Sequence, residues 1–266
     1  MIGTLLARTL RRHGWLTLAL LVFAAGLEAI VVQVAASFET GPGLAGMLEL
    51  LPDFMQRLVG SQLREAGFAS FVAFGLQHPG LMVASIGWVV VLGTAPAGDR
   101  DAGTLDLLLA RPVPRGCYLA ATSIALLLGA VALPLAALTG LGLGLSMVSV
   151  EGQLPWTAYL PAAAGLVALL LCVGGFTLLV SAGARRRGTA VARISAVLLV
   201  LWFLESLADL SVVLDTLRWI SPFAWYHPIR SAVEGGLWAP ADLALLCVAG
   251  ALMGAAGFVR FARRDL

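Results

Sequence analysis

The sequence contains no lysine and has little charge of either sign. Only 12% of its 266 residues are charged, all 17 basic residues are arginine, and 60% of the chain is hydrophobic. Soluble domains carry roughly 25% charged residues, so a soluble fold of this length could not bury so much apolar surface. The absence of lysine also excludes a phosphate-binding P-loop, whose G-x-x-x-x-G-K-[ST] pattern requires one. We therefore expect a membrane protein without a nucleotide-hydrolysis site of its own.

Metal-binding and catalytic patterns are absent as well. The three cysteines, Cys117, Cys172 and Cys247, are scattered through apolar stretches without a C-x-x-C pair, which predicts neither a disulfide framework nor a metal site. No H-E-x-x-H or G-x-S-x-G pattern occurs, so no known hydrolytic centre is indicated. We expect no catalytic residue, metal or cofactor in this chain, and no nucleic-acid partner.

Six apolar stretches are long enough to cross a bilayer, which requires about 20 residues each. They are residues 15–38, 81–97, 117–150, 156–184, 194–214 and 243–261. The sequence therefore predicts an all-α integral membrane protein in which residues 1–266 form one transmembrane domain. The third stretch exceeds the bilayer thickness, so we expect it to tilt, to kink at Pro134, or to break at Gly140–Gly144.

The arginines indicate how the chain is oriented. Four lie on one side of the apolar stretches, at Arg57, Arg64, Arg218 and Arg230. The other thirteen lie on the opposite side, close to the termini and in the loops around residues 98–115 and 185–193. Because short cytoplasmic loops are enriched in basic residues, both termini are predicted to be cytoplasmic. The expected location is the bacterial cytoplasmic membrane.

Two segments on the external side are too long to be simple turns. Within residues 39–80, the stretch 44–64 has leucines and charges at helical spacing, which predicts one or two surface helices. Residues 215–241 are rich in aromatic side chains, which favours anchoring at the membrane interface over contact with a substrate. The pair Gly250 and Gly254 is typical of helix packing, and packing within the chain is favoured over a dimer motif.

Three acidic residues in the apolar stretches are candidates for a transport pathway. Glu28 lies near the middle of the first stretch, where a charge costs several kcal/mol. It either lines a substrate or proton path or is a neutral structural acid. Glu205 and Asp209 lie four residues apart in the fifth stretch, on one face of the expected helix. Two stacked acids indicate a hydrated vestibule.

The cytoplasmic loop 98–115 has the most specific pattern. Thr104 is the expected N-cap of a short helix that runs to Ala110, and Pro112 ends it. This helix would place Leu105, Leu108 and Leu109 on one apolar face. Such a face fits a groove on another protein, or it lies on lipid headgroups.

This loop resembles the signature of permease subunits of ABC transporters of the type-2 (type V) exporter class. The matching residues are Asp101, Gly103, Thr104, Leu105, Asp106, Leu107, Leu108, Leu109, Pro112, Val113 and Arg115. Residues 219–228 are similar to the Ser-Pro-Phe-aromatic stretch before the last span of part of that class. One departure is Arg100, which separates Asp99 from Asp101 where the class often has adjacent acids.

The resemblance implies a separate ATP-binding subunit that carries ATP and Mg²⁺. Residues 1–13 would be an elbow helix on the inner leaflet, and residues 98–115 would be the coupling loop. Arg185–Arg187 would form a second contact with the ATPase, although anionic membrane lipid explains three arginines equally well. Two permeases and two ATPases are expected. The ATPase-coupling residues would be Asp99, Asp101, Gly103, Thr104, Leu105, Asp106, Leu108, Leu109, Arg111 and Arg115.

The cargo and one aspect of the mechanism stay open at this point. An apolar lining with few acids is compatible with a drug, an antibiotic, a lipid or a metabolite. One rival keeps the ATPase but transmits its motion to an extracytoplasmic partner without moving cargo. A second rival is an ATP-independent secondary transporter with Glu28 as the coupling acid.

Overall fold

The computed structural model describes residues 2–39, 67–105, 114–208, 211–233 and 239–263, and all regular structure in these residues is helical. Six helical segments are long and apolar enough to cross a membrane. These are Ile2–Phe38, Phe68–Gly93, Gly116–Ser146, Trp156–Gly183, Arg187–Ser206 and Pro240–Ala262. The prediction of an all-α membrane protein with six spans is confirmed.

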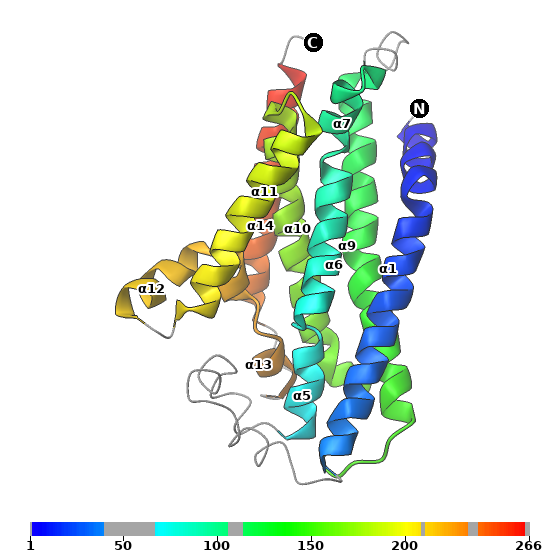
Figure 1. The fold of residues 1–266 in the computed structure, drawn as a ribbon, viewed down its shortest axis with the longest axis vertical. Helices are drawn as coiled ribbons and strands as arrows, with labels where there is room; N and C mark the ends of the chain where they lie inside the picture. The colour runs from blue at the N-terminus through cyan, green and yellow to red at the C-terminus, as the bar shows by residue number, and fades with distance from the viewer. Residues whose placement is uncertain (1, 40–66, 106–113, 209–210, 234–238, 264–266) are drawn as a thin grey trace.

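The long helices form a bundle in which the first turn of α1 and the last turn of α14 lie at the same end (Figure 1). The long elements are α1 (Ile2–Glu39), α6 (Pro79–Gly93), α9 (Arg115–Ser146), α10 (Leu160–Gly183), α11 (Arg187–Ser206) and α14 (Pro240–Ala262). The short ones are α5 (Phe68–Gly75), α7 (Ala95–Asp101), α12 (Val212–Leu217), α13 (Pro228–Val233) and the 3-10 turns η1 (Trp156–Tyr159), η3 (Arg218–Ile220) and η4 (Pro222–Trp225). The two ends of the described chain lie at the same end of the bundle, which agrees with an even number of spans.

Glycines allow the two closest helix pairs to form. In the pair α1–α9, a Cβ atom at Gly140 would collide with the carbonyl oxygen of Ala25. In the pair α10–α14, a Cβ at Gly250 would lie 2.7 Å from the carbonyl oxygen of Leu171. Small residues let backbones approach in lipid, where van der Waals contact replaces the hydrophobic drive. The prediction that Gly250 packs within the chain is confirmed.

The first span is a longer helix than the sequence suggested, and the third is one unbroken helix. Helix α1 is unbroken over 38 residues, so residues 1–13 do not form a separate elbow helix. No proline interrupts this region, and Gly14 alone does not end a helix. Helix α9 likewise continues through Pro134 and Gly140–Gly144 to Ser146, because the glycines there serve close contact with α1 rather than a break.

The second and fifth spans have different bounds from those predicted. The second begins at Phe68, inside the segment assigned to the exterior, and turns at residues 76–78 before α6 starts at Pro79. The imidazole Nδ1 of His78 accepts a hydrogen bond from the Gly80 amide at 3.1 Å, which caps α6. The fifth span begins earlier, at Arg187, and ends at Ser206 rather than 214. The surface helices predicted within 44–64 lie outside the described residues.

Candidate functional site

Helix α7 lies at the end of the bundle that holds the start of α1 and the end of α14 (Figure 1). The distribution of arginine predicts that this end is cytoplasmic. Thr94 ends α6, where its hydroxyl donates a hydrogen bond of 2.7 Å to the Val90 carbonyl. After α7 the chain turns at Gly103, whose φ of +66° is a conformation that glycine adopts without strain. The tight turn places Asp101 to Gly103 on the surface.

Asp99 of α7 joins three helices. Its carboxylate lies 2.8 Å from the Arg12 guanidinium of α1 and accepts a 2.6 Å hydrogen bond from the Tyr118 hydroxyl of α9. Asp99 is 5% exposed, whereas the side chain of Arg12 is about half exposed. An acid buried this far needs its partners, because an unpaired buried charge is costly.

The electrostatic balance keeps Asp99 ionised. Burial by itself raises the pKa of a carboxyl group, but the hydrogen bonds from Tyr118 and Arg12 outweigh it and hold the pKa of Asp99 below its usual value. Asp99 is therefore an anion near neutral pH. The hydrogen bonds that join α1 and α9 to the Asp99 carboxylate of α7 are therefore charge-assisted.

The residues after the turn pack inward, which corrects two predictions. Thr104 is already helical, and its hydroxyl donates to the Asp99 carbonyl at 3.1 Å instead of acting as the N-cap. Leu105 is fully buried and does not belong to an apolar face presented to a partner. The turn at Gly103 folds this part of the chain back onto α7, and sequence spacing alone could not reveal that.

A second set of contacts fixes α7 to the loop between α10 and α11. The guanidinium of Arg100 donates to the Ala184 carbonyl at 2.8 Å, and the Arg187 amide donates to the Asp101 carboxylate at 3.2 Å. The Arg187 guanidinium donates to the Val91 carbonyl of α6 at 3.0 Å. Arg187 therefore points into the bundle, while Arg185 and Arg186 are exposed.

The remaining coupling candidates are placed only in part. Arg115 is the first residue of α9. Asp106, Leu108, Leu109 and Arg111 lie outside the described residues. The sequence analysis missed the contacts of three residues that hold the site together: Arg12, which served only to assign orientation, Arg187, which was expected to contact the ATPase, and Tyr118. For Tyr118, the available signal was the position of a polar tyrosine at the start of a long apolar stretch.

Two of the three pathway candidates, Glu28 and Glu205, lie within the described residues. Glu28 is fully buried, and a Cβ atom at Gly75 of α5 would collide with its carboxyl oxygen. Among the described residues neither carboxyl oxygen has a hydrogen-bond partner. Helix α11 contains Glu205 and ends at Ser206, and Asp209 lies outside the described residues. Glu28 therefore faces α5 rather than an open path within this chain.

Comparison with protein-family models gives a match over nearly the whole chain. A family model described as ABC-2 family transporter protein matches residues 6–266. No curated protein and no solved structure matches the chain significantly. The match covers the second to sixth spans, all but the first four residues of the first span, and the cluster around Asp99.

Proposed function

The chain belongs to the ABC-2 transporter family, and we propose that it is the permease of an ATP-driven exporter of the bacterial cytoplasmic membrane. Membership makes it a multi-pass membrane subunit of an ABC transporter. The finer proposal is that the cargo is a drug, an antibiotic, a lipid or a metabolite, and that a separate ATPase subunit supplies the energy. Because six spans form half of a pathway in this class, we expect two permeases and two ATPases per complex.

The observation that carries the proposal is the double attachment of α7. Asp99 ties it to α1 and α9, and Arg100 and Asp101 tie it to the loop before α11. A push on the exposed turn Asp101–Gly103 would therefore reach helices on both sides of α7. Packed helices respond to such a push by moving as rigid bodies. This is the mechanical property that a coupling element requires.

The sequence supports placing ATP hydrolysis on another chain. A P-loop needs a lysine to contact the β- and γ-phosphates, and this chain contains none. ATP and Mg²⁺ would then be bound by the partner subunit. The rival in which Glu28 couples proton flow to transport has less support, because Glu28 is enclosed between α1 and α5.

Co-purification tests the proposal. The tagged permease is expressed with a candidate ABC ATPase subunit, and the ATPase retained on the permease is measured. Leu108→Asp is expected to remove the ATPase, because a charge would disrupt an apolar docking face. Thr216→Asp on exposed α12, far from α7 (Figure 1), is the matched control and should retain it. Retention of a fully active ATPase by Leu108→Asp would contradict docking at this loop.

A further inference from the structure

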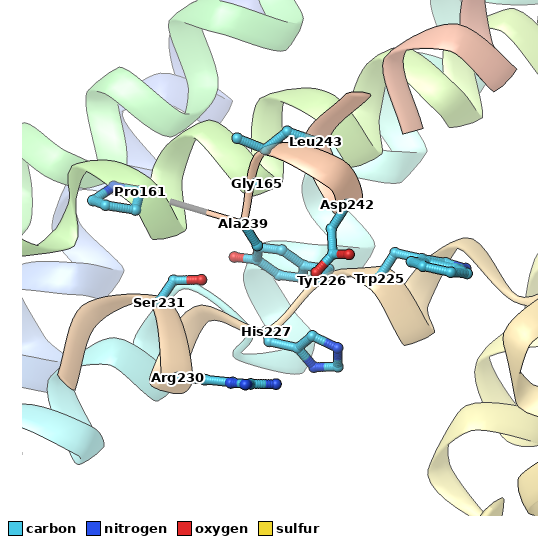
Figure 2. A pocket seen from close by; sticks show the side chains of 10 residues that line it. All are labelled: Pro161, Gly165, Trp225, Tyr226, His227, Arg230, Ser231, Ala239, Asp242 and Leu243. Atoms are coloured by element: carbon cyan, nitrogen blue, oxygen red, sulfur yellow. The ribbon is translucent and has the colours of Figure 1, made fainter. Parts of the chain in front are cut away.

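A polar cavity lies at the opposite end of the bundle from α7, around the start of α13 and the first turn of α14 (Figures 1 and 2). Its volume is about 320 Å³. Figure 2 shows Trp225, His227, Arg230 and Asp242 around it, with the ring of Tyr226 between them. Tyr226 is buried and donates a hydrogen bond of 3.0 Å to the Leu76 carbonyl. This bond fixes the floor of the cavity to the turn between α5 and α6.

An apolar cavity of about 280 Å³ lies beside it, between α10, α11 and α14. Its lining includes Phe176, Leu201, Leu246, Ala249, Met253 and Trp219. Val197 and Trp219, which also line it, are 41% and 49% exposed, so the cavity is open on the side of α11 and η3. A lipid-facing opening of this kind admits a hydrocarbon chain.

The two cavities are adjacent along one helix face. Trp225 lines both, and the Trp225 indole N–H donates to the Trp219 carbonyl at 3.1 Å, which fixes the ring. Asp242 in the polar cavity is followed by Leu246, Ala249 and Met253 in the apolar one, on one face of α14. Eleven residues of helix cover about 16 Å. One elongated ligand can therefore extend along this face.

The charges of the polar cavity have both signs. Arg230 is cationic and Asp242 is anionic. Burial lowers the pKa of His227, Arg230 and Arg218 lower it further, and Asp242 and a hydrogen bond with the Ala224 backbone raise it in part. His227 is therefore mostly neutral near pH 7 and acts as a hydrogen-bonding group rather than as a second cation.

We propose that these two cavities form one binding site for an amphiphile that has a zwitterionic phosphate–ammonium head and a single acyl chain. The phosphate would bind Arg230 and His227, because guanidinium is a strong donor to phosphate oxygens. The ammonium would lie near Asp242 and the face of Trp225, since aromatic rings attract quaternary ammonium groups. The acyl chain would fill the apolar cavity. Binding at this site requires neither ATP nor transport, so the inference is independent of the proposed function.

Native mass spectrometry of the delipidated full chain tests the acyl-chain part, with lysophosphatidylcholine as the probe. Ala249→Phe fills the apolar cavity and is expected to weaken binding at least about tenfold. Leu252→Phe on the lipid-facing side of α14 is the matched control and should bind as the wild type does. If Ala249→Phe fails to fold, Val197→Trp fills the same cavity from α11.

The head-group part is tested with lysophosphatidic acid, which lacks the ammonium group. The strength of cation–π and ion-pair contacts predicts that the wild type prefers lysophosphatidylcholine to lysophosphatidic acid about five- to tenfold. Asp242→Asn is expected to abolish this preference. Arg230→Gln should weaken both probes. Equal binding by wild type, Ala249→Phe and Val197→Trp would overturn the proposal. So would a cavity occupied by a second copy of the chain, seen as a dimer that Ala249→Phe dissociates while no probe binds to the wild type.

Discussion

The guanidinium of Arg12 lies 2.8 Å from the carboxylate of Asp99 and thereby joins the first helix to α7 across 87 residues of sequence. The same carboxylate accepts the Tyr118 hydroxyl of α9 at 2.6 Å. Three helices, of which α1 is far from the other two in the sequence, thus meet at one buried acid. We expect the stability of this end of the bundle, and the proposed transmission of motion through it, to depend on this group.

Loss of the Asp99 carboxylate should destabilise the protein. Asp99→Ala leaves the Tyr118 hydroxyl and the Arg12 guanidinium without their shared acceptor, and we expect a cost of about 2 kcal/mol. The thermal unfolding temperature in detergent measures the effect. The control is Asp215→Ala, which breaks the exposed pair with Arg218 at 3.3 Å and should change stability by no more than about 0.5 kcal/mol. Equal effects of the two substitutions would contradict the role given to burial.

Tyr118→Phe tests the third member of the cluster. Removing the hydroxyl takes a donor from the buried Asp99 carboxylate, which we expect to cost about 1–3 kcal/mol. Tyr159→Phe is the matched control, because its hydroxyl makes a long hydrogen bond of 3.5 Å to the Ala69 carbonyl, compared with 2.6 Å for Tyr118 and Asp99. Chemical or thermal unfolding of the two variants should rank Tyr118→Phe as clearly less stable.

The Asp99 cluster should also make stability depend on pH. The pKa of Asp99 is lower in the folded protein than in the unfolded chain, so its contribution is complete above the ordinary carboxyl pKa of about 4 and is lost as pH falls through the folded value. We expect the unfolding temperature to drop below about pH 4. Asp99→Asn should show a smaller acid-induced drop than the wild type. An identical acid profile in the variant would show that another group is responsible.

The close contact between α1 and α9 gives a packing prediction. In Gly140→Ala the new methyl group would collide with the Ala25 carbonyl, so the two helices must separate, at a cost of about 1–3 kcal/mol. Gly87→Ala in α6 is the control, because a Cβ there meets open space and alanine favours the helix. Unfolding measurements should therefore show opposite signs for the two substitutions.

Glu28 offers a test of the secondary-transporter rival. An unpaired carboxylate within the membrane is costly, so we expect Glu28 to be a neutral packing group that glutamine can replace. Glu28→Gln should fold normally and retain the ATPase. Proteoliposomes under an imposed pH gradient, monitored with a pH-sensitive dye, should show no proton entry that depends on Glu28. Proton entry in the wild type that disappears in Glu28→Gln would favour the rival.

The class of the fold followed from the sequence because hydropathy alone determines which segments can cross a bilayer. The residues at which individual helices begin and end depended on tertiary contacts. The fifth span begins at Arg187 because its guanidinium bonds the Val91 carbonyl inside the bundle, whereas a count of apolar residues excludes arginine. Similarly, α1 includes the residues that were predicted to form an elbow helix, because no residue between 2 and 13 ends a helix.

The candidate site was predictable as a segment but not as a set of contacts. The sequence pattern singled out the loop 98–115, but it did not predict the turn at Gly103, where the positive φ favours glycine. The partners of Asp99 are Arg12 of α1, 87 residues before it, and Tyr118 of α9, 19 residues after it. Helical or strand periodicity in the sequence cannot reveal that such distant residues are in contact. The burial of Leu105 follows from the turn that brings Thr104 back to Asp99.

Site-specific cross-linking tests the central claim most directly. In a background without Cys117, Cys172 and Cys247, a single cysteine replaces Ala102 in the exposed turn after α7, and a short bifunctional reagent is added to the complex with the ATPase. We predict a cross-linked species that contains one permease and one ATPase, and none with a cysteine at Thr216. The absence of that species for Ala102→Cys, in a complex that still hydrolyses ATP, would contradict the assignment of this turn as the contact with the ATPase.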